Sequence, residues 1–311
     1  MSRETEKIMK ELQQFLALHS DEATDEESVD RLTRQFLLEC SSYPHSRKDA
    51  APETADDYLD LAEQASSKKK RLEYLRKALE LEPEHVDAQL EMIVHTMEKT
   101  PEEQLPALRK LMAAAAEPLE QEGCFKRDMG EFWAVLETRP YMRVRHTYFD
   151  ALISCGMIHC AISEGEELLK LCENDNLGVR YQLMHLYACT EDELHALALH
   201  KRFDSCEETQ MLLPLAVLYY KLNQFDRAKD YLKRLAAVNK DTKKFFRAAA
   251  GDRLEEFFMD MSPYGYRPFT IDELLEDLLL SPYLFASVPH FFQWASSYLR
   301  TQTTSRKRKQ P

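Results

Sequence analysis

The stretch 211–238 reads MLLPLAVLYYKLNQFDRAKDYLKRLAAV, and its pattern decides the fold class. Apolar residues recur at three- and four-residue spacing, which is typical of amphipathic helices. We expect two antiparallel helices, 211–222 and 226–238, joined by a short turn. The wider stretch 139–241 repeats this pattern toward the N-terminus, with helix pairs expected over 141–171 and 178–200.

The composition of the whole chain agrees with an all-α protein. The 311 residues are 44% hydrophobic and 31% charged, and only 7 are glycine. A disordered chain would hold fewer apolar residues, and β-rich folds need more turn glycines. We find no sustained apolar–polar alternation and no Asn-Gly hairpin turn. We therefore predict an all-α superhelical stack of antiparallel helix pairs with atypical terminal helices.

The net charge and the cysteines limit the classes of partner and the cellular compartment that we expect for the protein. The net charge of -13 argues against broad nucleic-acid binding, because phosphates repel such a surface. No apolar run reaches about 18 residues, and the start of the chain is polar, so we expect neither a membrane span nor a secretory signal. Seven scattered cysteines without a CxxC pair fit reduced thiols in the cytoplasm.

Composition changes and turn residues divide the chain into six segments. Several helix starts are marked by capping boxes, with Thr100, Thr190 and Thr270 each followed three residues later by glutamate. The predicted segments are an N-terminal helical hairpin (1–41), a linker (42–52), divergent repeat-like helices (53–138), core repeats (139–241), C-terminal capping helices (242–300) and a disordered basic tail (301–311).

The chain resembles the tetratricopeptide-repeat family. The resemblance rests on Ala78 with Pro83, on Gly156 with Ala161, and on Ala216, Tyr219, Phe225 and Ala228 in the last pair. It covers roughly half of the chain. The RPYM start at 139–142 and the segment DNLGVRY at 175–181 are similar to a loosely defined, uncharacterised group of bacterial repeat proteins. The family motif is structural and implies no reaction.

The resemblance implies a scaffold that binds a peptide or protein segment in a concave groove. Arginines in such a groove would pair with the carboxylates of an acidic peptide. Asp150 stands where carboxylate-clamp members of the family carry asparagine, which argues against capture of a C-terminal carboxylate. The expected groove residues are Arg143, His146 and Asp150 from one helix, Arg180, Met184 and Tyr187 from the next, and Leu213, Val217, Tyr220 and Lys221 from the last.

We expect no catalytic centre, no cofactor and no metal. The chain has no glycine-rich phosphate loop, no Gly-x-Ser-x-Gly elbow and no His-Glu-x-x-His motif. Two Cys/His pairs with four-residue spacing, Cys155 with His159 and His185 with Cys189, are the residue types that bind zinc. Gly156 breaks the first pair, because the turn between two helices falls there. Buried packing thiols are the simpler interpretation.

Two basic runs, 68–71 and 306–309, leave an alternative function open. Either run is compatible with contact to RNA or to an acidic partner. A nucleic-acid-associated protein is therefore one alternative, and a regulatory subunit of an enzyme complex is another. The primary hypothesis remains a non-enzymatic interaction scaffold without a membrane contact.

Overall fold

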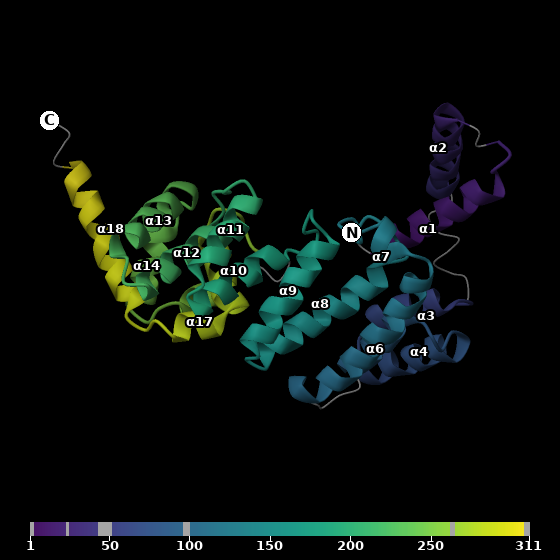
Figure 1. Ribbon diagram of the computed structural model, residues 1–311, viewed down its shortest axis with the longest axis horizontal. Helices are drawn as coiled ribbons and strands as arrows, with labels where there is room; N and C mark the ends of the chain where they lie inside the picture. Colours follow the sequence, from purple (N-terminus) through teal and green to yellow (C-terminus); the bar gives the residue numbers. More distant parts are fainter. Residues whose placement is uncertain (1–2, 23–24, 43–51, 96–99, 262–264, 308–311) are drawn as a thin grey trace. The chain divides into compact units, whose positions relative to one another are not determined.

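The computed structural model describes residues 3–22, 25–42, 52–95, 100–261 and 265–307, and these residues are helical with no β-strand (Figure 1). The all-α expectation is thus confirmed. No helix in the described ranges combines the length and apolar character needed to cross a bilayer. The chain divides into two compact units, 1–145 and 146–311, and the division falls inside helix α8.

Unit 1 contains seven helices of its own among the described residues and the start of α8. Leu59, Leu75 and their small neighbours Ala62, Ala78 and Ala88 form a core between α3, α4 and α5. The helices are α1 (Arg3–Leu18), α2 (Glu26–Ser42), α3 (Ala55–Glu63), α4 (Lys68–Leu81), α5 (Val86–His95), α6 (Pro101–Gln121), α7 (Cys124–Arg127) and α8 (Arg139–Ser154). The predicted linker 42–52 lies mostly outside the described residues.

Ion pairs attach α1 to the rest of unit 1. Lys7 Nζ lies 2.5 Å from Asp57 Oδ1 of α3. Glu6 is buried and pairs with Arg139, at 3.2 Å, and with Arg143, at 2.9 Å. Burying carboxylates and guanidiniums is costly unless they are paired and hydrogen-bonded. The pairing of Glu6 with two arginines therefore explains how α1 can bury a charge against α8.

Unit 2 begins with the end of α8 and packs its helices mainly as sequential neighbours. In the described residues α9 packs on α10, α10 on α11 and on α12, and α12 on α13. The helices are α9 (Ile158–Leu171), α10 (Val179–Thr190), α11 (Glu193–Arg202), α12 (Thr209–Lys221), α13 (Phe225–Val238), α14 (Thr242–Ala249), α15 (Glu255–Phe258), α16 (Ile271–Leu280), α17 (Pro282–Ala286) and α18 (Phe291–Lys307).

One turn geometry recurs between α8 and α9, between α10 and α11, and between α12 and α13. Gly156, Glu191 and Asn223 have left-handed φ values of 68°, 60° and 59°. The next residue in each turn donates its backbone N–H to the carbonyl five residues earlier, at 2.9 Å in all three cases. This is the hydrogen bond that closes a Schellman-type helix end. The chain therefore reverses direction in the same way three times.

Small residues allow the paired helices to approach closely. Ala161, Ala196 and Ala228 each lie five residues after the left-handed turn residue, and all three are fully buried. Gly165 on α9 is tighter still, since a Cβ there would lie 3.0 Å from the ring of Phe149 and 3.2 Å from Leu183. The predicted close approach at Ala161 is consistent with its burial and is extended by Gly165.

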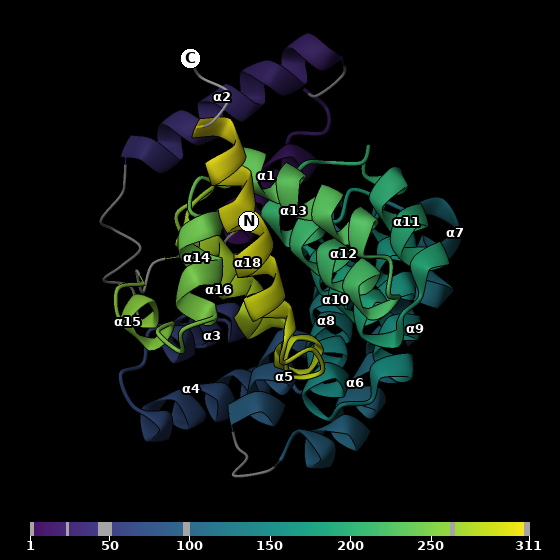
Figure 2. The same ribbon diagram turned by 90° about the vertical axis from the view of Figure 1, so that its left-hand side faces the viewer.

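The C-terminal helices pack back onto the earlier helices of unit 2. α16 contacts α12 and α14, α17 contacts α10, and α18 contacts α13 and α14. Figure 2 shows α14, α16 and α18 side by side. Aromatic side chains line these contacts: Phe246 and Phe291 are fully buried and Phe292 is half-buried, and their ring centroids lie 5.8–6.1 Å apart. The segment predicted to cap the repeats is thus built into the core of this unit.

Three local predictions need correction. Thr100 precedes α6 but makes no side-chain cap hydrogen bond, so the capping box predicted there is absent. Thr190 does not cap α11, because it is the last residue of α10 and donates to the Leu186 carbonyl; Asp192 is the N-cap and accepts from His195 N. The tail is helical as far as Lys307, so helix α18 enters the segment predicted to be disordered. Thr270 is the N-cap of α16, as predicted, but it accepts from Asp272 N, and Glu273 accepts from Phe269 N instead of completing the expected box.

Candidate functional site

The expected groove residues lie in several different environments. Met184, Leu213 and Val217 are fully buried. Tyr187 is also buried, and its hydroxyl donates to Glu166 Oε1 at 2.8 Å. These four side chains belong to the core of unit 2 and do not line an open surface.

Arg143 lies in unit 1, inside the ion-pair network described above. Its guanidinium donates to both carboxylate oxygens of Asp87, at 2.8 and 2.6 Å, and to Glu6. Such bidentate pairing uses the donors that a ligand carboxylate would need. The geometry therefore makes Arg143 a structural arginine rather than an open ligand-binding group.

Other predicted residues form small local contacts. His146 Nδ1 lies 3.3 Å from Asp150 Oδ2, and Gln182 donates to the other Asp150 oxygen at 2.9 Å. Tyr220 packs against the rings of Phe291 and Trp294, with centroids 5.2 and 5.1 Å away.

Lys221 has a helix-capping role. Its Nζ donates to the carbonyls of Ala188 and Cys189 at the end of α10. A lysine there satisfies carbonyls that have no partner within the helix and complements the helix dipole. This position is thus explained by the stability of α10, without a ligand.

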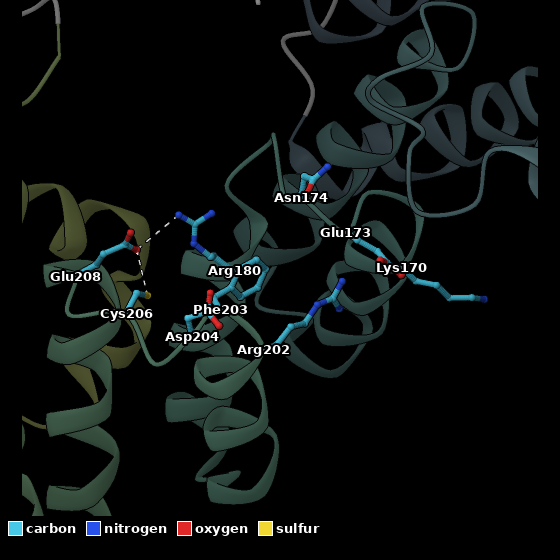
Figure 3. Close-up of a pocket in the computed structure, with 9 residues that line it drawn as sticks. All are labelled: Lys170, Glu173, Asn174, Arg180, Arg202, Phe203, Asp204, Cys206 and Glu208. Atoms are coloured by element: carbon cyan, nitrogen blue, oxygen red, sulfur yellow. Dashed lines mark hydrogen bonds and ion pairs between the residues drawn. The ribbon is translucent and has the colours of Figure 1, made fainter.

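Arg180 lines an open cavity (Figure 3), and Tyr220 and Lys221 line a smaller one of about 360 Å³ beside α17. The Arg180 cavity has a volume of about 750 Å³, which is in the range of ligand sites. It is formed by the end of α9, the start of α10, the end of α11 and the loop before α12. Its lining residues are Lys170, Glu173, Asn174, Arg180, Arg202, Phe203, Asp204, Cys206 and Glu208.

Local structure holds Arg180 in one orientation. Asp175, itself in a left-handed conformation, accepts from the backbone N–H groups of Val179 and Arg180 and so caps α10. The same carboxylate accepts from Arg180 Nη1 at 3.0 Å. Burial raises the pKa of Asp175, and the hydrogen bonds from Arg180 and Val179 oppose this effect. The cap and the arginine are therefore mutually dependent.

Aromatic rings enclose the guanidinium of Arg180. Its Cζ lies 4.1 Å from the ring centre of Tyr181 and 5.1 Å from that of Phe203. The hydroxyl of Tyr181 donates to Glu208 at 2.9 Å, and Glu208 is 3.6 Å from Arg180 Nη2. Stacking and pairing together restrict the arginine side chain, which lowers the entropy lost when a ligand binds.

Arg202, the last residue of α11, supplies a second guanidinium to the cavity lining. Its Nη2 donates to the carbonyl of Leu169 at 2.7 Å, and its Cζ lies 5.7 Å from the Phe203 ring. Lys170 adds a third cation, and Glu173, Asp204 and Glu208 add three carboxylates. The rim thus carries both charge signs within one opening.

The thiol in this cavity is not suited to nucleophilic chemistry. Burial and the neighbouring Glu208 charge raise the pKa of Cys206 to about 11. A thiol is a nucleophile as its thiolate, and at neutral pH this cysteine is almost fully protonated. Its Sγ instead donates to Glu208 at 3.5 Å.

The two Cys/His pairs do not come together. His159 is exposed, whereas His185 is buried next to Asp277 of α16, with Nε2 to Oδ1 at 3.5 Å. Within the ranges that the structure describes, no three Cys, His, Asp or Glu side chains are placed to share a metal ion.

The basic run 68–71 occupies the start of α4. Lys68, Lys69 and Lys70 are exposed, while Arg71 turns inward and donates to the carbonyl of Ala62 at 3.1 Å. Arg71 thereby connects α4 to the end of α3. Only the three lysines are left as an outward-facing charge cluster at this turn.

Sequence reasoning identified Arg180 but missed Arg202, Glu208 and Phe203. The pattern of apolar spacing says nothing about these residues, because they come from a helix end and a loop. The mainly polar run at 202–208, which separates two helices and carries both charge signs, could have indicated them.

No protein-family model matches the chain, and no curated protein matches it significantly.

Proposed function

We propose that the protein is a non-enzymatic interaction module that binds a segment of a partner protein at the Arg180 cavity of unit 2. The observation that carries this proposal is the cavity itself, in which two arginines are held rigidly by backbone and aromatic contacts. Rigid, stacked guanidiniums are well suited to bind carboxylates in a peptide. The neighbouring carboxylates would select a segment that also carries donors.

We further propose that unit 2 is a stack of tetratricopeptide-like repeats. The turn residues Gly156, Glu191 and Asn223 are separated by 35 and 32 positions. The family repeat is about 34 residues long. Identical turn hydrogen bonds and buried alanines at matching positions support the same assignment. In this arrangement α8, α10 and α12 are the first helices of the pairs.

The partner segment is expected to contain an acidic side chain flanked by polar groups. The carboxylate of this segment would contact Arg202 and the outer edge of Arg180. Arg202 donates to the backbone carbonyl of Leu169, so that hydrogen bond leaves its charge without a carboxylate. The backbone N–H groups of the segment would donate to Asp204 or Glu173. The opposite charges around the rim would favour one orientation and reject purely acidic or purely basic ligands.

A defined peptide library tests the proposal. Immobilised acetylated octapeptides with a fixed central aspartate or glutamate and varied flanks would be probed with the full-length protein. We expect a subset to bind, and Arg202→Gln to weaken the best of them at least tenfold. Arg253→Gln is the matched control, because Arg253 is exposed and lies outside the cavity lining.

Arg180 requires a gentler change because its loss would leave buried Asp175 without a cation. Arg180→Lys keeps the charge but loses the stacking and the fork geometry, so weaker binding and a modestly lower melting temperature are the expected result. Equal binding by wild type and Arg202→Gln would refute the cavity as the site. The absence of any bound peptide would refute acidic-segment recognition.

A further inference from the structure

The first helices of the repeat pairs in unit 2 are covered by the chain's own C-terminal segment. α16 packs on α12, and α17 packs on α10. The contacts are apolar, since Leu274, Leu275 and Leu284 are fully buried. The side of α10 and α12 that α16 and α17 cover includes His185 and Thr209, which were not among the groove residues expected from the sequence. The helices packed there therefore indicate which side chains this surface can bind.

The first polar anchor of the covering helix is Glu273. Its Oε2 accepts from Thr209 Oγ1 of α12 at 2.8 Å and from Asn239 Nδ2 at 3.4 Å. Thr209 and Asn239 are both fully buried, and Glu273 is only 6% exposed. Thr209 is a buried donor directed at this carboxylate and would be costly to leave without a partner. Asn239 Nδ2 also donates to the Thr270 carbonyl at 2.8 Å, and the Phe269 N–H donates to the same Oε2 at 2.8 Å, so the anchor includes the backbone just before α16.

The second anchor is Asp277, one helical turn further along α16. Its Oδ1 lies 3.5 Å from Nε2 of His185 on α10, and both side chains are almost completely buried. Phe285 of α17 closes over the imidazole, with ring centroids 5.8 Å apart. Because residues four apart share a helix face, Glu273 and Asp277 both point at the receiving helices.

We propose that this side of α10 and α12 is a second binding surface, a receptor for a partner helix of the pattern Glu-Leu-Leu-x-Asp, occupied in this structure by the protein's own α16. Thr209 and Asn239 donate hydrogen bonds to the first carboxylate, and His185 pairs with the second. The apolar surface between them packs against the leucines. A partner helix with this pattern replaces α16 and α17. This is helix-in-groove recognition, in which anchors recur one turn apart.

Two features favour the exchange of α16 and α17 for a partner helix. None of the four polar side-chain atoms of His185 and Asp277 has a hydrogen-bond partner within the described residues. Such unmet buried groups cost free energy. Phe269, just before α16, has a left-handed φ of 59°, a strained conformation for an aromatic residue. A partner helix that places its second carboxylate closer to His185 would therefore bind this surface more tightly than α16 does.

Hydrogen exchange with mass spectrometry on the full-length protein tests this inference. The probe is a synthetic peptide of residues 268–287, added in excess. We expect α16 and α17 to exchange faster than α10 and α12 without the peptide, because they open locally. With the peptide present, exchange of the protein's own α16 and α17 is expected to rise at least tenfold, while α10 and α12 stay protected.

A peptide with Glu273→Gln and Asp277→Asn is the matched control and is expected to have at least tenfold less effect. Exchange of α16 and α17 only together with α10 and α12 would overturn the inference, as would equal effects of the two peptides. Dimer formation without peptide binding, seen by light scattering, would replace the partner helix with a second copy of this chain. Because Arg202→Gln leaves this surface unchanged, failure here and failure of the Arg180 cavity are distinguishable.

Discussion

Arg143 and Arg180 show how one residue type serves two purposes in this protein. The sequence pattern predicted that both arginines line one groove, on equivalent helices. Arg143 is instead bound to Asp87 and Glu6, while Arg180 faces an open cavity. The difference lies in carboxylates that are distant in sequence: Glu6 is 137 residues from Arg143. Helical periodicity contains no information about such partners.

Removing the Arg143 guanidinium should destabilise unit 1. Arg143→Leu leaves the buried carboxylates of Asp87 and Glu6 without this cation, and breaking a buried ion pair from one side costs about 3–5 kcal/mol. Urea unfolding of the full-length protein measures the change. Lys233→Met is the control, because its pair with Asp230 is exposed and should contribute about 0–1 kcal/mol. Equal effects of the two substitutions would contradict the structural role of Arg143.

The His85–Asp56 pair predicts a pH-dependent contribution to stability. The hydrogen bond from His85 lowers the pKa of Asp56 to about 2. Burial alone would lower the pKa of His85, but the hydrogen bond and the charge of Asp56 outweigh it and raise that pKa above 6.5. The contribution of His85 is present below pH 6.5 and is lost as the pH rises through its raised pKa. That of Asp56 is present above pH 3.8 and is lost as the pH falls toward 2.

The pair should therefore stabilise the protein most between about pH 4 and 6.5. We expect His85→Gln to lower the melting temperature most in this window and progressively less at higher pH. Melting curves of wild type and variant across pH 3–9 provide the measurement. His159→Gln, at an exposed histidine, is the control and should change little at any pH. A constant difference across this range would rule out the proposed linkage.

At the scale of elements, the left-handed turns decide how successive helices pair. Gly156, Glu191 and Asn223 occupy the same position in three turns, yet only one is glycine. Glycine and asparagine tolerate this conformation, and glutamate does so at a cost. The sequence indicated the turn at Gly156 through its residue type. It also indicated a helix break at Thr190, one residue before Glu191, but it did not indicate that a glutamate takes the left-handed conformation there.

Substitutions at the turns should change stability in opposite directions. Gly156→Ala should destabilise unit 2 by roughly 1–2 kcal/mol, because a Cβ is strained at this φ although the space around it is open. Asn223→Gly should stabilise it by a smaller amount. Thermal unfolding compares both with Gly251→Ala, a control glycine without a left-handed φ. A neutral Gly156→Ala would contradict the assigned turn geometry.

At the scale of the molecule, two compact units meet inside a continuous helix. The division lies between Arg145 and His146, within α8. Unit 1 uses the first part of α8 for its ion pairs, and unit 2 uses Phe149 and Asp150 from the later part. A chain of this length is not expected to unfold in one all-or-none step. Each unit should therefore respond to its own substitutions.

Hydrogen exchange distinguishes the two units. Arg143→Leu should accelerate exchange in α1 and α5, whose side chains pair with it, and leave α9 and α10 nearly unchanged. Gly165→Ala should do the reverse, because its Cβ would collide with Phe149 and Leu183, and overpacking typically costs about 1–3 kcal/mol. Ser163→Ala on the exposed side of α9 is the control. Uniform acceleration by either variant would mean that the chain opens as one unit.

The sequence by itself determined the helical class of the protein, most of its helices, and the turn at Gly156, because these depend on local periodicity and on residue types that favour particular backbone angles. It also singled out Arg180. Only the tertiary structure decided that Arg202, Phe203 and Glu208 join Arg180, that Arg143 is held by Glu6 and Asp87, and that α16 packs on α12 and α17 on α10. These outcomes depend on which distant side chains meet and which charges find partners once the chain is packed, and no local pattern specifies that.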